Sequence, residues 1–209
     1  EARIVARLRH ANIVNVYAAG ERDGLLYFVM EYVEGETLRD LLEREKRLPP
    51  ARTATILCDI AQALAYAHAH DVIHRDLKPE NILLEAETGR ALLTDFGVAQ
   101  AAAMPAPGSY TPDGRMTGTG IVLGSPRYMS PEQAAGERSL DGRSDIYALG
   151  LVGYEALAGE PVFGAASGPS LMAKHITERP AGLVARAPGV PAPLAEVIER
   201  ALEKSPDAR

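Results

Sequence analysis

The spacing of apolar residues over the first thirty positions predicts the end of a helix followed by two strands. Residues 2–9 place apolar side chains at helical spacing, as on the packed face of a helix. Residues 13–17 and 25–30 are mostly apolar, and the turn-forming stretch 20–24 separates them. We therefore expect a helix end and two strands joined by a turn.

Two helices are predicted next. Thr37, followed three residues later by Asp40, forms a capping box that opens a short helix running through residue 44. A longer helix is expected over residues 50–70, because its apolar residues recur at helical spacing. That stripe consists of Ile56, Ile60, Leu64 and Ala67.

The middle of the chain returns to short strands and then loses its pattern. Residues 82–84 and 91–94 are short apolar runs that predict strands. Residues 101–120 have no periodicity and predict a loop. Ser130, with Gln133 three residues later, forms a second capping box, so a helix is expected to restart there.

The last part of the chain is predicted to be helical. Residues 146–157 are apolar on nearly every side, which predicts a helix buried at the centre of a lobe. A membrane span is excluded there by the short length and by Asp145 and Glu155. Residues 194–204 predict one more amphipathic helix. A mixed α/β part followed by a mainly helical part indicates the α+β class.

Composition narrows the function classes. The 209 residues are 46% hydrophobic and 24% charged, as in soluble globular proteins. A net charge of −6 with no basic stretch argues against binding to nucleic acid or to an anionic membrane. The single cysteine, Cys58, excludes an internal disulfide, and its apolar neighbours predict a buried, inert thiol. No leader or membrane-length apolar run occurs in these residues, so we expect a cytoplasmic location, with a membrane anchor outside these residues left open.

Residues suited to phosphoryl transfer gather in residues 74–81, with the sequence His-Arg-Asp-Leu-Lys-Pro-Glu-Asn. Asp76 is the candidate group that accepts or orients a substrate hydroxyl, because its carboxylate needs only hydrogen-bond reach to it. Lys78 could hold the transferring phosphoryl group as a point charge.

A second motif, Asp-Phe-Gly at residues 95–97, follows soon after. Asn81 and Asp95 supply a neutral and an anionic oxygen, which suit Mg²⁺ better than nitrogen or sulfur ligands would. Each motif alone is a common loop sequence. Together, in this order and spacing, they predict a metal-dependent phosphotransfer site.

With these motifs the chain resembles the eukaryotic-like Ser/Thr protein kinases of bacteria over essentially its whole length. The matching segments are the catalytic-loop triplet 74–76, the magnesium triplet 95–97, Ser-Pro-Glu at 130–132, Asp-Ile-Tyr-Ala-Leu-Gly at 145–150, and Arg209. The resemblance implies a protein-kinase-like fold with two lobes. It divides the chain into part of a small lobe (1–30), a hinge (31–35) and a large lobe (36–209) with an activation segment at 95–132.

The same resemblance implies ATP and Mg²⁺ as cofactors and assigns the nucleotide site. Met30 would be the gatekeeper, while Glu31 and Val33 lie in the hinge that hydrogen-bonds adenine. Leu83 would lie beneath the adenine ring. Glu1 lines up with the glutamate that pairs with the family's ATP-binding lysine.

A stack of apolar side chains is also implied between the lobes. It would consist of Val5, Val16, His74 and Phe96, and Asp145 would anchor it. The resemblance further pairs Arg209 with Glu132 in an ion pair.

Lys78 implies, by resemblance, transfer to Ser or Thr hydroxyls of protein substrates, because Ser/Thr kinases carry lysine at this position. Ser125 takes the place usually held by Thr and would contact Asp76 and Lys78. Residues 105–115 resemble an insertion without an assigned role.

Arg75 suggests regulation by phosphorylation. In relatives, this arginine grips a phosphate on the activation segment. Thr117 and Thr119 are placed like the Thr-x-Thr that bacterial members phosphorylate on themselves. The alternative is that they are two unmodified threonines in a glycine-rich loop.

Two other functions remain open, because no Gly-x-Gly-x-x-Gly phosphate loop occurs in the 209 residues. That loop and the ATP-binding lysine would precede Glu1, so this stretch is expected to show little transfer on its own. A pseudokinase-like binding module is disfavoured because the catalytic and metal-ligating types are intact. A small-molecule phosphotransferase is disfavoured by Ser-Pro-Glu at 130–132 and the long activation segment.

Overall fold

The structure, a computed structural model, describes residues 8–22, 25–96, 125–137, 139–164 and 167–209. Its strands are β1 (Val16–Arg22), β2 (Leu25–Met30), β3 (Gly35–Thr37), β4 (Ile82–Glu85) and β5 (Ala91–Leu93). Its α-helices are α2 (Leu38–Glu45), α3 (Pro50–His68), α5 (Pro131–Ala134), α6 (Arg143–Ala158), α7 (Gly168–Thr177), α8 (Leu183–Arg186) and α9 (Ala192–Ala201). Short 3-10 helices are η1 (Pro79–Asn81), η2 (Pro126–Tyr128) and η3 (Pro206–Ala208).

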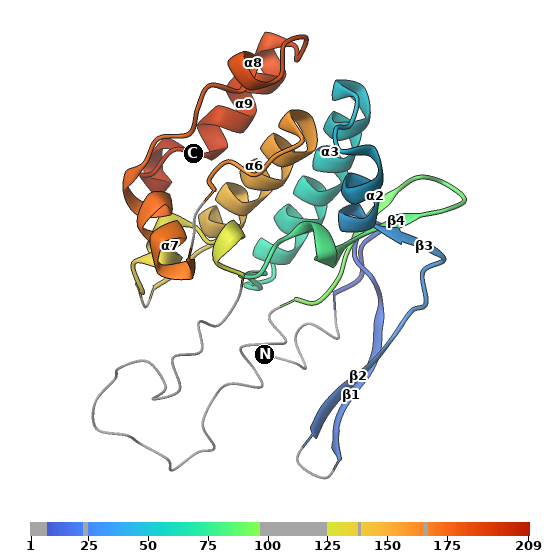
Figure 1. The fold of residues 1–209 in the computed structure, drawn as a ribbon. Helices are drawn as coiled ribbons and strands as arrows, with labels where there is room; N and C mark the ends of the chain where they lie inside the picture. The colour runs from blue at the N-terminus through green and yellow to red at the C-terminus, as the bar shows by residue number, and fades with distance from the viewer. Residues whose placement is uncertain (1–7, 23–24, 97–124, 138, 165–166) are drawn as a thin grey trace, which may run out of the picture.

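The strands form two separate sheets. β1 and β2 pair antiparallel as a hairpin that projects from the helical body (Figure 1). β3, β4 and β5 form a second antiparallel sheet in that order. Gly89 lies in the turn between β4 and β5, and its φ of 70° suits a residue without a side chain.

The first predicted strand is placed wrongly. β1 starts at Val16 rather than residue 13 and continues through Gly20 to Arg22, which were expected to form the turn. Backbone pairing with β2 extends the strand past its apolar part, because hairpin hydrogen bonds do not require buried side chains. Ile13 instead makes an isolated parallel bridge to Leu93.

The predicted central helix is confirmed as α6. Every residue from Tyr147 to Ala158 except Leu149 is buried, and α6 packs against α3 and α9 (Figure 1). The contact with α3 is close: a Cβ added to Gly153 would lie 2.8 Å from Leu57 Cδ1. Small residues in α6 therefore let the helices approach closely.

The prediction for Cys58 is wrong, because this thiol is exposed. Cys58 lies two positions from both Ile56 and Ile60, and residues two apart on a helix point in different directions. Ile56 and Ile60 are buried, so Cys58 faces outward from α3. Apolar neighbours in sequence are not neighbours on a helix face.

Both capping boxes are confirmed. In α2 the Asp40 N–H donates to Thr37 Oγ1 and the Thr37 N–H donates to Asp40 Oδ2, each at 3.1 Å. Ser130 and Gln133 make the same reciprocal pair at α5. These bonds satisfy backbone N–H groups that helix starts leave unpaired.

Some elements were not predicted or differ in extent. β3, α7 and α8 had no prediction, and α9 begins and ends earlier than residues 194–204. Leu8 and Arg9, at the end of the predicted first helix, are not helical. The rest of that helix and the predicted loop at 101–120 lie outside the described residues.

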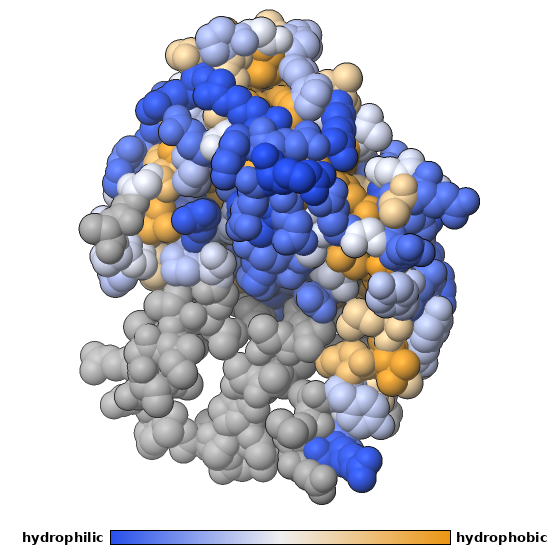
Figure 2. Space-filling model, turned by 45° about the vertical axis from the view of Figure 1, so that its right-hand side comes forward, coloured by the Kyte–Doolittle hydropathy of each residue, from blue (hydrophilic) through white to orange (hydrophobic). Residues whose placement is uncertain are grey.

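The surface differs between the two parts. In Figure 2 the helical body is mainly hydrophilic, while apolar side chains gather over the hairpin. The exposed hairpin residues include Tyr17, Tyr27, Val29 and Met30. Across the described residues, no helix combines the length and apolarity needed to cross a membrane.

Candidate active site

Asp145, near the start of α6, holds the segment that carries the first motif. Its Oδ2 accepts the His74 N–H and its Oδ1 accepts the Arg75 N–H, both at 2.8 Å. His68 Nε2 lies 2.8 Å from the same Oδ2, and the Asp145 side chain is 1% exposed. The start of residues 74–81 is therefore fixed to the core of the helical body, as the prediction that Asp145 is an anchor requires.

Arg75 makes the sharp bend in this segment. Its φ of 66° lies in the left-handed region, which is unusual for a residue with a side chain. Gln133 Nε2 donates to the Arg75 carbonyl at 2.8 Å, while Gln133 Oε1 accepts from the Ser130 N–H. The start of α5 is thereby tied to the bend.

Asp76 and Lys78 lie together at the surface of the segment. Lys78 Nζ donates to Asp76 Oδ2 at 2.7 Å, and both side chains are about one quarter exposed (24% and 25%). The Asp76 carbonyl accepts from Asn81 Nδ2 at 2.9 Å. The carboxylate is thus held by its own loop and still open to an incoming group.

Asn81 and Asp95 are the candidate magnesium ligands. Asn81 is buried and uses Nδ2 to bind Asp76, which leaves its amide oxygen as the available ligand. The Thr94 N–H donates to the Asn81 carbonyl at 3.0 Å, so Asp95 follows directly from a residue bonded to this loop. Asp95 is exposed with a φ of 60°.

These two oxygen donors fit a magnesium ion that takes its remaining ligands from water and phosphate. Among the described residues, no group of three or more His, Cys, Asp or Glu side chains could hold a metal by itself.

His74 and Phe96 form the described part of the predicted stack. Their ring centroids lie 4.9 Å apart, and His74 Nε2 lies 2.8 Å from the Thr94 carbonyl. Val16 lines a small cavity that Phe96 also lines, so three of the four predicted members meet in one region. Val5 lies outside the described residues.

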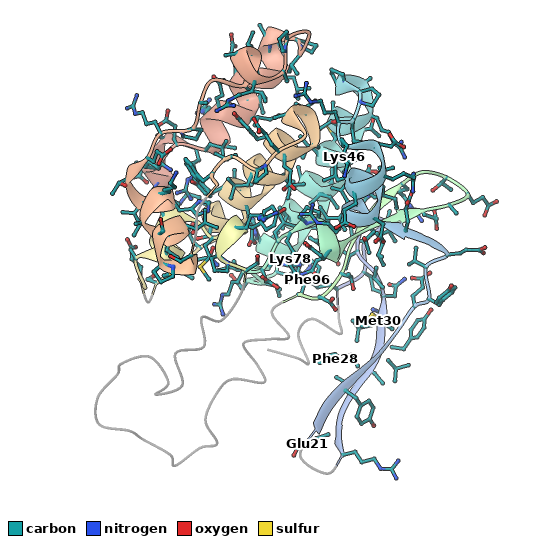
Figure 3. All side chains as sticks on the ribbon, in the orientation of Figure 1. Glu21, Phe28, Met30, Lys46, Lys78 and Phe96 are labelled. Atoms are coloured by element: carbon teal, nitrogen blue, oxygen red, sulfur yellow. The ribbon has the colours of Figure 1, made fainter. Side chains whose placement is uncertain are left out.

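This small cavity lies between the hairpin and the end of β5, and it is lined by Val14, Val16, Phe28, Met30, Thr94, Asp95 and Phe96. Figure 3 shows Phe28 and Met30 on the hairpin and Lys78 and Phe96 at the adjacent end of the helical body. Thr94 Oγ1 lies 3.8 Å from Met30 Sδ. Met30 therefore lies beside Thr94 and lines the same cavity as Asp95, while its role as gatekeeper stays a prediction.

The other predicted nucleotide residues are not among those that line this cavity. Glu31 bonds to Asn15 through its N–H (2.8 Å) and through Oε2 (2.7 Å), which orients the start of the segment after β2. Val33 is half-buried, and Leu83 is half-buried in β4. Glu1 lies outside the described residues.

A second cavity, of about 200 Å³, opens beside Asp76. Its lining includes Arg75, Asp76, Ser125, Tyr128 and Gln133. Ser125 therefore lines the same cavity as Asp76, and its predicted contact with Asp76 and Lys78 stays a prediction. Thr117 and Thr119 lie outside the described residues.

The predicted ion pair between Glu132 and Arg209 is confirmed. Arg209 Nη1 and Nη2 bind Glu132 Oε1 and Oε2 at 2.7 and 2.8 Å, and Ser144 Oγ donates to Oε1 at 2.7 Å. Burial alone would raise the pKa of Glu132, but the bonds from Arg209 and Ser144 lower it overall. The Glu132 carboxylate is therefore charged and paired with the Arg209 guanidinium.

Sequence reasoning missed two supports of the site. The bonds from His68 to Asp145 and from Gln133 to the Arg75 carbonyl join residues 77 and 58 positions apart. No local pattern marks such pairs. The Ser130–Gln133 capping box located Gln133 but gave no sign of its second bond.

The sequence of this chain is similar to those of known protein kinases. The family described as "Protein kinase domain" matches residues 1–209. The chain is 42% identical, over its full length, to the serine/threonine-protein kinase PknB of Mycobacterium tuberculosis, and 40% identical over 99% of its length to PrkC of Bacillus subtilis. It covers 33% and 30% of those proteins, so it spans about a third of these curated relatives.

Solved structures agree on the fold. A PknI kinase domain variant from M. tuberculosis superposes with a TM-score of 0.74 at 30% sequence identity, covering 99% of this chain and 69% of that one. The predicted protein-kinase-like fold class is confirmed.

Proposed function

The chain belongs to the protein kinase domain family and is related to bacterial Ser/Thr kinases, and we propose that the full-length protein catalyses transfer of the γ-phosphoryl group of ATP to Ser or Thr hydroxyls of proteins, its own included. The observation that carries the proposal is the grouping of Asp76, Lys78 and Asn81 on one loop anchored by Asp145. The cavity beside Asp76 gives a protein hydroxyl a place to enter.

Each member of the loop has a proposed task. Asp76 accepts or orients the substrate hydroxyl, since its carboxylate is held and partly exposed. Lys78, bonded to that carboxylate, offsets charge on the transferring phosphoryl group. Asn81 and Asp95 would hold Mg²⁺, which supplies charge neutralisation for the phosphates when bound.

The nucleotide and regulatory roles are proposals of the same kind. The adenine side would involve Met30, Glu31, Val33 and Leu83, with Glu1 pairing to a lysine elsewhere in the protein. Arg75 would bind phosphate on Thr117 or Thr119, and Ser125 would lie at the acceptor. The division of the chain into part of a small lobe (1–30), a hinge (31–35) and a large lobe (36–209) remains a prediction.

For the whole protein, we propose protein substrates rather than nucleic acid, and a cytoplasmic catalytic domain. The net charge of −6 supports the first point, because a nucleic-acid surface needs clustered basic residues. The alternative of a binding module makes a different prediction: it would bind partners without transferring phosphate.

The test is phosphoryl transfer by the full-length protein from labelled ATP to a generic protein acceptor with Mg²⁺. Asp76→Asn keeps the shape of the side chain but removes its charge, and transfer is expected to fall by about 100- to 10,000-fold. Asp141→Asn, at an exposed aspartate paired with Arg143, is the matched control and is expected to keep activity. Wild-type protein that transfers no phosphate while staying folded would favour the binding module.

A further inference from the structure

Arg39, in the first turn of α2, uses its guanidinium to join three separate segments. Nε donates to Glu80 Oε1 at 3.0 Å and Nη1 donates to Glu155 Oε1 at 2.9 Å. Nη2 donates to the hydroxyl of Tyr128. The Arg39 side chain is 17% exposed; its bonds to Glu155 and Tyr128 are partly buried, whereas its bond to Glu80 is exposed.

The three partners come from parts of the chain with different tasks. Glu80 lies in η1, next to the candidate metal ligand Asn81. Tyr128 lies in η2 and lines the cavity that Asp76 also lines. Glu155 lies in the buried helix α6.

Tyr128 and Glu155 are bonded to each other as well. The Tyr128 hydroxyl donates to Glu155 Oε2, so the arginine, the tyrosine and the glutamate close a ring of hydrogen bonds. Burial, and then the charge of Glu155, raise the pKa of Tyr128, which keeps this hydroxyl protonated and able to donate. Both oxygens of Glu155 are thereby used.

Arg39 gains no stabilisation from the dipole of its own helix. A cation in the first turn lies at the positive end of the helix dipole, where an acidic residue is favoured. Lysine could replace it only in part, because a single ammonium lacks the rigid fork that reaches several partners at once. The contacts across the chain therefore explain why an arginine occupies this place.

We infer that Arg39 is a positioning residue that fixes the Ser125–Tyr128 wall of the acceptor cavity against the loop carrying Asp76 and Asn81. This inference rests on the proposed kinase function, since it concerns the binding of the protein acceptor. This role is distinct from nucleotide binding, because the small cavity beside Met30 and Phe96 is not lined by Arg39 or by its partners Glu80, Tyr128 and Glu155.

The test measures KM for the acceptor protein and KM for ATP separately in the full-length protein. Arg39→Gln is expected to raise the acceptor KM about tenfold, the equivalent of one charge-assisted bond, with the ATP KM within about twofold of wild type. Tyr128→Phe keeps the ring and removes the hydroxyl, and should raise the acceptor KM by a smaller factor. Arg39→Lys should recover only part of the loss.

Two further variants keep the result interpretable. Arg44→Gln removes another ion pair from the same helix, at a side chain that is 57% exposed, and should leave both KM values unchanged. If Arg39→Gln folds poorly because Glu155 is left unpaired, the double variant Arg39→Gln/Glu155→Gln removes that charge and should still show the raised acceptor KM.

The possible outcomes distinguish the proposed kinase function from the positioning role of Arg39. Wild-type protein without phosphoryl transfer would overturn the proposed function, and this inference with it. Active wild type, with Arg39→Gln or the double variant keeping the wild-type acceptor KM, would overturn the positioning role alone. An equal rise in both KM values, or a lower melting temperature with unchanged kinetics, would show a general structural role instead.

Discussion

The β1–β2 hairpin is regular over most of its length, whereas residues 74–81 contain only one short 3-10 helix. The irregular segment is nevertheless held more firmly in the structure than the hairpin. Asp145 holds its backbone, and Asn81 closes it by bonding to the Asp76 carbonyl. Among the described strands the hairpin pairs only with itself, and Tyr17 and Val29 are 63% and 47% exposed.

This difference shows where the geometry of the site originates. Regular hydrogen bonding shapes the hairpin, while the bonds that Arg9 and Thr94 make to Val16 and Met30 are long, at 3.4 and 3.8 Å. Buried carboxylates in the helical body fix residues that have no regular structure, because an unpaired buried polar group is costly. Changes in the helical body should therefore matter more than changes in the hairpin.

The largest effect is expected from Asp145→Ala. The N–H groups of His74 and Arg75 would lose their acceptor at about 1–3 kcal/mol each, and the bond to His68 would also be lost, for a total of about 5 kcal/mol. Urea unfolding measures this loss. Asp141→Ala, at an exposed aspartate just before α6, should cost less than about 1 kcal/mol. Equal costs would contradict the anchoring role.

Arg209→Ala comes next, because it leaves Glu132 as an unpaired carboxylate in a nearly buried place. The side chains of Arg209 and Glu132 are 1% and 7% exposed, and the expected cost is about 3–5 kcal/mol. The control is Arg143→Ala, whose partners Asp141 and Asp207 are both exposed, with an expected cost below about 1 kcal/mol. Thermal melting of Arg209→Ala at the wild-type temperature would contradict the prediction.

How much of the site can be predicted from the sequence depends on how far apart in the chain the interacting residues lie. The catalytic and metal-ligating candidates Asp76, Lys78 and Asn81 could be predicted because they lie within six residues, so any compact loop brings them together. The two capping boxes were predictable for the same reason, since Thr37–Asp40 and Ser130–Gln133 interact across a single turn.

The rest depends on pairings that no short pattern encodes. Arg39 meets Glu155 across 116 positions, and Gln133 meets Arg75 across 58. The extent of β1 depends on its pairing with β2, and the exposure of Cys58 depends on which face of α3 meets the core. These features follow from packing, which apolar spacing alone does not specify.

A pH effect of intermediate size should arise from His175 in α7. Burial, and then the charge on Lys204, lower the pKa of His175 to about 4 from 6.5. Between these values the unfolded chain binds a proton that the folded chain does not, so the free energy of unfolding falls as the pH falls, by at most about 3 kcal/mol. His175→Gln should remove this part of the pH dependence, as measured by urea unfolding from pH 7 to 4. Parallel curves for wild type and variant would exclude this source.

The smallest effect is expected from Val29→Thr on the outer face of the hairpin. This side chain is 47% exposed, so the free energy of unfolding should change by no more than about 0.5 kcal/mol. The matched control is the same substitution at Val152, which is 0% exposed in α6, where a buried hydroxyl should cost about 1–3 kcal/mol. Urea unfolding of the two variants compares the regions with one chemical change. If Val29→Thr cost as much as Val152→Thr, the hairpin would be held as firmly as the helices, and the contrast between the two regions would be lost.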